Sequence, residues 1–119
     1  MANNQSSEDY LECILLLSRE SEFVHRVDVA RRIGVSQPAV QKAVKILESA
    51  GYVECDGMHI HLTLKGEKYA ADIFDRHCTI TKFLQKIGVN PADAEQDACK
   101  MEHILSEASF DAIKKFLDK

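Results

Sequence analysis

Apolar side chains recur along most of this chain at the three- and four-residue spacing of amphipathic helices. Residues 52–62 differ, because apolar and polar side chains alternate there on both sides of an Asp-Gly pair, as in a β-hairpin. The predicted helices cover residues 7–18, 27–33, 36–50, 63–88, 91–105 and 110–117. The expected fold is therefore mainly α, with a hairpin between the third and fourth helices.

The second and third predicted helices have the end signals of a helix-turn-helix. Gly34 follows the last apolar residue of the first of these helices, where a left-handed residue commonly closes a helix. Ser36 can cap the next helix, and Pro38 is tolerated in its first turn. In this motif the second helix enters the major groove of DNA by its N-terminal residues. The hairpin that follows would then be the wing of a winged helix.

Basic charge is concentrated in this same region. The net charge of the chain is −4, which by itself argues against nucleic acid, yet residues 24–50 carry five basic and two acidic side chains. A local basic patch is what phosphate binding requires. The outward positions of the 36–50 helix are small, amide or basic, whereas an ordinary solvated helix would include acids. We therefore expect DNA contacts from Arg26, Ser36, Gln37, Pro38, Ala39, Gln41, Lys42 and Lys45.

The predicted wing has no Lys or Arg, so we expect its contacts with the DNA backbone to be weak. His59 and His61 share one strand face, because side chains two apart in a strand point the same way. Two imidazoles on one face can ligate a metal ion. The simpler interpretation, which we favour from the sequence, is that both histidines face solvent.

Metal-ligating side chains occur at helical spacing in two places. Cys99, Glu102 and His103 stand at i, i+3 and i+4, and together they offer a thiol, a carboxylate and an imidazole on one helix face. Asp9 and Glu12 stand at i, i+3 in the first helix. Acids near the start of a helix are also favoured by the helix dipole, and donor residues meet by chance on surface helices. The spacing alone therefore leaves both a metal site and ordinary surface positions open.

Composition narrows the setting of the protein. No apolar run approaches the roughly 20 residues that cross a bilayer, and the N-terminus is polar and acidic, unlike a signal peptide. The four cysteines are scattered without a C-x-x-C pair, so disulfides are not expected. We expect a cytoplasmic protein without membrane contact. We expect a winged-helix domain over residues 1–63 and a helical domain over residues 64–119, which dimerises because so few helices bury little on their own.

Several short motifs, taken together, resemble a known family. They are SEDYLE at residues 7–12, the segment 26–53, LTLKG at 62–66, RH at 76–77 and MEH at 101–103. In their order and spacing across nearly the whole chain, they resemble the diphtheria toxin repressor family, most closely its manganese-transport-regulator branch. The resemblance implies a homodimeric, metal-dependent transcriptional repressor of metal-uptake genes. Its N-terminal winged helix would bind double-stranded operator DNA, and its C-terminal helical domain would bind metal and dimerise.

Residue by residue, the resemblance implies a binuclear metal site, with two divalent ions per subunit. Cys99 stands where the manganese branch has glutamate, while the iron-sensing branch has cysteine there but methionine at the position of Asp9. This hybrid pattern leaves both Fe(II) and Mn(II) open, and a thiolate favours iron over manganese. Metal would neutralise the clustered acids and fix the spacing of two recognition helices. The implied ligands are Asp9, Glu12, His77, Cys99, Glu102 and His103.

Three other functions are compatible with parts of the sequence. In a winged-helix regulator without metal, Cys99 would pack in a core and Glu102 and His103 would lie on the surface. In a thiol redox sensor, Cys13 and Cys99 would be the reactive residues. An enzyme is not expected, because no Gly-rich phosphate loop or third orienting group accompanies the Cys99–His103 pair, and no small-molecule substrate is predicted.

Overall fold

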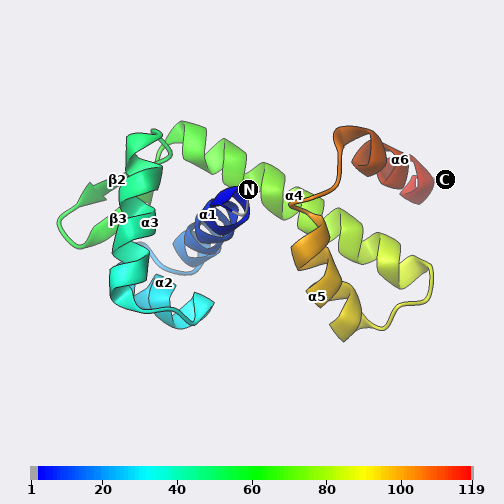
Figure 1. Cartoon of the computed structure of the whole chain (residues 1–119), viewed down its shortest axis with the longest axis horizontal. Coiled ribbons are helices and arrows are strands. Elements are labelled where there is room, and N and C mark those ends of the chain that lie inside the picture. Colours follow the sequence, from blue (N-terminus) through cyan, green and yellow to red (C-terminus); the bar gives the residue numbers. More distant parts are fainter. Residues whose placement is uncertain (1–2, 119) are drawn as a thin grey trace. The chain divides into compact units, whose positions relative to one another are not determined.

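The computed structural model describes the backbone of residues 3–118 and the side chains of residues 7–118. Helices predominate, as expected, and a small sheet interrupts them (Figure 1). None of the helices in this described part is long and apolar enough to cross a membrane. The elements in chain order are α1 (Asn3–Glu20), β1 (Val24–His25), α2 (Arg26–Ile33), α3 (Gln37–Ser49), β2 (Val53–Asp56), β3 (His59–Leu62), α4 (Leu64–Lys86), α5 (Pro91–Met101) and α6 (Glu107–Leu117).

The chain divides into two compact units, and the division falls within α4. The N-terminal unit, Met1–Ala71, contains α1 to α3, the sheet and the start of α4. The C-terminal unit, Asp72–Lys119, contains the rest of α4 together with α5 and α6. Each unit has its own buried apolar side chains. In the C-terminal unit, one core cluster contains Ile80, Leu84, Ala94, Ala98 and Phe110.

The helix-turn-helix has the local geometry that its sequence predicts. Gly34 has φ +85°, the left-handed conformation expected after α2, and its N–H donates to the carbonyl of Ala30 at 2.9 Å. The hydroxyl of Ser36 accepts a hydrogen bond from the N–H of Ala39 at 3.2 Å and so caps α3. On the inner side of α3, Val40 and Val44 are buried. Burial of this apolar stripe leaves the opposite side of α3 facing outward.

The sheet has three antiparallel strands in the order β1-β3-β2. The predicted hairpin is present, with Gly57 and Met58 as its two loop residues and Gly57 at φ +64°. Inward side chains alternate with outward ones, and Val24 pairs with Ile60 on the buried face. Periodicity did not predict β1, because two residues are too few to show an alternating pattern.

The start of α4 is held closely against the end of α3 and the first residues of the wing. The hydroxyl of Thr63 accepts from the N–H of Gly66 at 3.0 Å and donates to the carbonyl of Gly51 at 2.7 Å. Gly66 lies so near the backbone of Tyr52 that a Cβ at this position would stand 1.9 Å from the Tyr52 carbonyl oxygen. The close approach therefore requires glycine at position 66.

Three predicted helix ends differ from the structure by three residues or more. α1 begins at Asn3 rather than at Ser7, α6 begins at Glu107 rather than at Phe110, and α5 ends at Met101 rather than near Leu105. Glu102 is the C-terminal cap of α5, and the chain then turns before α6. The guanidinium of Arg76 on α4 donates to the carbonyls of Glu102 and Leu105, at 3.0 and 2.8 Å. The two carbonyls therefore accept hydrogen bonds from a side chain of α4 instead of from the N–H groups of a further helical turn, and α5 does not continue.

Candidate DNA-binding and metal-binding sites

The predicted DNA-binding residues lie on the helix-turn-helix, and most of them are exposed. Ser36, Gln37, Pro38, Lys42 and Lys45 are exposed, and Ala39 and Gln41 are half-buried. α3 carries no acid in its first turn, and its basic side chains project from the face opposite its buried stripe. An exposed helix face with amides and ammonium groups can contact both base edges and phosphates.

Arg26 differs from the other predicted DNA contacts. It opens α2 and is half-buried, and its Nε has no hydrogen-bond partner among the described residues. A buried donor without a partner costs roughly 1–3 kcal/mol, so a bound anion reached by this guanidinium would relieve the cost. The position is compatible with a phosphate contact at the edge of the helix-turn-helix.

The C-terminal unit brings three of the predicted metal ligands together. Nδ1 of His77, on α4, lies 2.7 Å from Oε1 of Glu102, and Nε2 of His103 lies 3.5 Å from the other oxygen, Oε2. The Glu102 side chain is 0% exposed and that of His103 is 2% exposed. Oε2 of Glu102 has no hydrogen-bond partner in the part of the chain that the structure describes.

This arrangement has the donor chemistry of a metal site. An isolated carboxylate is rarely buried, since removing it from water costs several kcal/mol unless it is paired or coordinates a metal. Glu102 is partly compensated by the two neighbouring imidazoles, and one of its oxygens remains available. Carboxylate and imidazole together suit first-row divalent ions such as Mn(II), Fe(II) and Zn(II). The residues present therefore fit a divalent metal.

Arg76 holds the segment that carries two of these ligands. Its two hydrogen bonds to the carbonyls of Glu102 and Leu105 join α4 to the turn after α5. Its guanidinium also lies 4.6 Å from the ring centre of Phe110. Glu107 completes the network at 3.7 Å from Arg76. Local spacing did not reveal this role, because the partners lie 26 and 29 residues away in the sequence.

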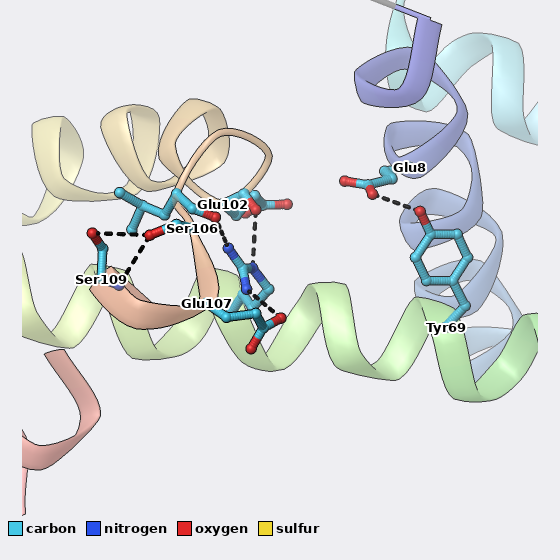
Figure 2. A network of polar contacts seen from close by, with 8 residues as sticks. Glu8, Tyr69, Glu102, Ser106, Glu107 and Ser109 are labelled. Atoms are coloured by element: carbon cyan, nitrogen blue, oxygen red, sulfur yellow. Dashed lines mark hydrogen bonds and ion pairs between the residues drawn. The ribbon is translucent and has the colours of Figure 1, made fainter. Parts of the chain in front are cut away.

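The remaining predicted ligands lie on α5 and α1. Cys99 lies on α5 and is exposed, unlike Glu102. Asp9 and Glu12 lie on α1 in the N-terminal unit and are half-buried. In that same unit the hydroxyl of Tyr69 donates to Glu8 at 2.6 Å (Figure 2). Burial is the largest cause of a raised pKa at Tyr69, and this hydrogen bond is the second. Glu8 therefore has a structural partner on α4.

Comparison with known proteins gives two family models that together cover most of the chain. Residues 4–59 match the model described as "Iron dependent repressor, N-terminal DNA binding domain". Residues 63–119 match "Iron dependent repressor, metal binding and dimerisation domain". The two matches follow the order of the winged helix and the helical unit in the chain.

Individual relatives agree with the family models. The transcriptional regulator MntR of Escherichia coli O157:H7 is 42% identical over 113 residues, which cover 94% of this chain and 73% of that protein. The HTH-type transcriptional regulator MntR of Lysinibacillus sphaericus is 34% identical over 109 residues, which cover 91% of this chain and 78% of the relative.

Solved structures show the same fold. The metal-dependent transcriptional regulator MtsR superposes with a TM-score of 0.87 at 32% identity, over 99% of this chain and 55% of that one. The manganese regulator SloR gives 0.83 at 31% identity, over 94% and 53%. The chain thus spans about half the length of these solved structures.

The fold and the donor set define a class of protein, namely a winged helix-turn-helix transcriptional regulator with a metal-binding helical unit. The family models and the relatives narrow this class further. The chain belongs to the iron-dependent repressor family. The resemblance inferred from the sequence motifs is thereby confirmed, and so is the expectation that the protein is a regulator and not an enzyme.

Proposed function

We propose that this chain is a cytoplasmic, homodimeric repressor that binds operator DNA when it is loaded with Fe(II) or Mn(II), and that it controls genes of metal uptake. Its family membership supports this function, and structural neighbours are named for manganese regulation. The observation that carries the proposal is the buried Glu102 carboxylate, which has one imidazole beside each oxygen. Its Oε2 has no hydrogen-bond partner among the described residues.

The metal ligands are the six residues that the family resemblance implies. Glu102, His77 and His103 supply the buried part of the set. Glu12 is a further carboxylate that the family resemblance assigns to the site. Asp9 and Cys99 complete a site for two ions per subunit. When bound, the metal supplies positive charge that neutralises the carboxylates, and binding requires deprotonated donors, so it weakens in acid.

Cys99 governs the choice between iron and manganese. A thiolate is a softer donor than a carboxylate and favours Fe(II), Co(II) or Zn(II) over Mn(II). Cys99 is exposed on α5, so its side chain is accessible for a ligand role without opening a core. Zn(II) would bind tightly in vitro, as the general affinity order requires, without being the physiological signal.

DNA is bound through α3 of each subunit. Lys42 and Lys45 contact phosphates, and Gln37 and Gln41 offer amides that can read base edges in the major groove. Residues 1–63 form the DNA-binding domain and residues 64–119 form the metal-binding and dimerisation domain. A dimer places two recognition helices about one DNA turn apart.

Metal loading and DNA binding are coupled because the ligands come from both domains. Asp9 and Glu12 belong to the DNA-binding domain, whereas His77, Cys99, Glu102 and His103 belong to the dimerising domain. Shared ligation makes the placement of the recognition helices depend on metal. This is coupling between two sites through a bistable arrangement.

The experiment that tests the proposal compares Glu102→Gln with Glu107→Gln. The control acid, Glu107, has an 86% exposed side chain and is near Arg76 rather than near an imidazole. Anaerobic isothermal titration with Mn(II) and Fe(II) measures metal binding, and fluorescence anisotropy with an operator obtained by binding-site selection measures its effect on DNA affinity.

Glu102→Gln is expected to lose both the metal heat and the metal-stimulated DNA binding, because a neutral amide replaces the central anionic donor. Glu107→Gln is expected to retain both properties. Metal binding by wild-type protein that leaves DNA affinity unchanged would refute metal-dependent repression. Unaltered metal binding in Glu102→Gln would refute the assigned site.

A further inference from the structure

Three of the five histidines of the chain lie together on the outer face of the wing. His25 on β1 pairs directly with His59 on β3, and His61 is two residues further along β3. Direct cross-strand partners and residues two apart share one face of a sheet. The opposite face carries Val24 and Ile60, which are buried. We propose that this outer face is a second metal site, which takes an imidazole-preferring divalent ion of the zinc type through His25, His59 and His61.

One of the two ring separations is that of histidines sharing a metal ion, and the other is wider. The ring centres of His25 and His59 are 4.7 Å apart with planes at 77°, and those of His59 and His61 are 6.3 Å apart at 87°. Two imidazoles bound to one tetrahedral Zn²⁺, each at about 2.0–2.1 Å, have ring centres roughly 5 Å apart. His61 is exposed, so a change of side-chain rotamer closes the wider gap without moving the strand.

His25 has a carboxylate partner of the kind that orients a metal-binding histidine. Nδ1 of His25 lies 3.4 Å from Oδ2 of Asp28, and the same oxygen accepts the backbone N–H of His25 at 3.0 Å. A ligating imidazole usually presents its second nitrogen to a carboxylate or carbonyl, which fixes its tautomer and orientation. The contact with Asp28 leaves Nε2 of His25 as the nitrogen for metal.

The central ligand, His59, is held in place by an aromatic neighbour. Phe23 stacks on the His59 ring at 4.4 Å between ring centres, with planes at 27°. A stacked neighbour covers the face of an imidazole, whereas metal binds a nitrogen at the ring edge. The stacking therefore restricts the ring without blocking the donor atoms.

The charge of this face attracts a cation. Glu54 pairs directly with His61, and Asp56 pairs directly with His59, so both carboxylates lie on the histidine face. The three strands contain no Lys or Arg that would repel a metal ion from within the sheet. Three imidazoles with carboxylates beside them are a donor set that zinc, nickel and copper prefer to manganese.

This site is separate from the one proposed around Glu102. Its ligands belong to β1 and β3 of the N-terminal unit, and none of them is among the six proposed ligands of the regulatory metal. Its failure would leave the proposed function intact, and failure of the regulatory site would leave the wing site intact.

The test counts bound Zn²⁺ per chain by equilibrium dialysis at micromolar free zinc and about pH 7.5, where imidazole is largely neutral. The protein carries Glu102→Gln, which weakens the regulatory site, and is compared with and without the added pair His59→Asn and His61→Asn. Met58→Gln is the matched control, because Met58 is 69% exposed in the hairpin loop beside His59 and offers no imidazole.

The histidine pair variant is expected to bind about one Zn²⁺ fewer per chain, and Met58→Gln is expected to bind the same number as its parent. Equal zinc counts in all three proteins would overturn the proposal. So would a difference that appears only at millimolar zinc, because exposed histidines bind metal adventitiously at that level.

Nuclear magnetic resonance of the histidine side chains provides a second measurement that does not depend on how the variants fold. On titration of the full chain with Zn²⁺, the ring resonances of His25, His59 and His61 are expected to shift together and to reach a plateau at one added equivalent beyond the regulatory site. Resonances of the three rings that do not move, or that move at different zinc concentrations, would exclude a shared ion.

Discussion

Replacing Gly66 with alanine is expected to destabilise the N-terminal unit through a backbone clash. The added Cβ would lie 1.9 Å from the carbonyl oxygen of Tyr52 and 2.8 Å from its carbonyl carbon. Ordinary contact begins at 3.4 Å, so the shortest distance is 3.4 − 1.9 = 1.5 Å too small. Since both atoms of Tyr52 belong to the backbone, no side-chain rotation can relieve the clash, and the start of α4 must move.

The size of the effect follows from three contributions. Overpacking of this kind costs about 1–3 kcal/mol. Displacement of α4 also weakens the hydrogen bond from the Gly66 N–H to Thr63, which is worth about 1 kcal/mol. Alanine regains about 1 kcal/mol over glycine in a helix. The net loss is roughly 1–3 kcal/mol, which lowers the melting temperature by about 4–12 °C for a chain of this size.

Thermal unfolding followed by circular dichroism or calorimetry measures this loss. Glu67→Ala is the control, because Glu67 is the next residue in α4 and is exposed, and its melting temperature is expected to stay within a few degrees of wild type. A Gly66→Ala protein that melts with the wild type would show that α4 and Tyr52 do not pack as closely as described.

Three further predictions concern DNA, metal and thiol chemistry. Lys42→Ala is expected to weaken binding to all DNA sequences and to lower the slope of log affinity against log salt by about one, because it removes one phosphate contact. Relaxed preference at a single base pair, measured by anisotropy across salt concentrations, would instead make Lys42 a base reader. Arg76→Gln is expected to weaken metal binding about 10–100-fold in isothermal titration, because Glu102 and His103 lose the hydrogen bonds that hold their segment; unchanged affinity would limit Arg76 to a structural role. Burial raises the pKa of Cys13 to about 11, so only roughly one thiol in a thousand is ionised at about pH 8. Mass spectrometry is therefore expected to find Cys99 alkylated first, with Cys13 reacting only as the pH approaches its pKa, and fast modification of Cys13 at neutral pH would revive the thiol redox sensor.

Local signals in the sequence were sufficient where short-range chemistry decides the structure. Gly34 and Ser36 adopt the predicted roles because a left-handed residue and a side-chain cap act within a few residues of their own position. The hydroxyl of Thr63, which caps α4, acts over the same short range. The helix-turn-helix and the hairpin could therefore be placed from the sequence alone.

Long-range contacts were beyond the reach of the pattern. The end of α5 depends on Arg76, whose partners are distant in sequence. The spacing of apolar residues therefore predicted a helix that is too long at its C-terminal end. Helical spacing placed Cys99 on one face with Glu102, yet Cys99 is exposed and Glu102 is buried after α5 has ended. His77 was assigned only through the family resemblance, because nothing in its own surroundings marks it as the partner of Glu102.

At Glu102, selection for stability and selection for the response to metal act in opposite directions. Without metal, one buried oxygen of Glu102 has no hydrogen-bond partner among the described residues, and leaving such a group unsatisfied costs roughly 1–3 kcal/mol. A library of variants screened for heat resistance alone is thus expected to accumulate substitutions at position 102 and to lose its response to metal. Stabilised variants of this regulator must therefore be selected under conditions that also require their response to metal.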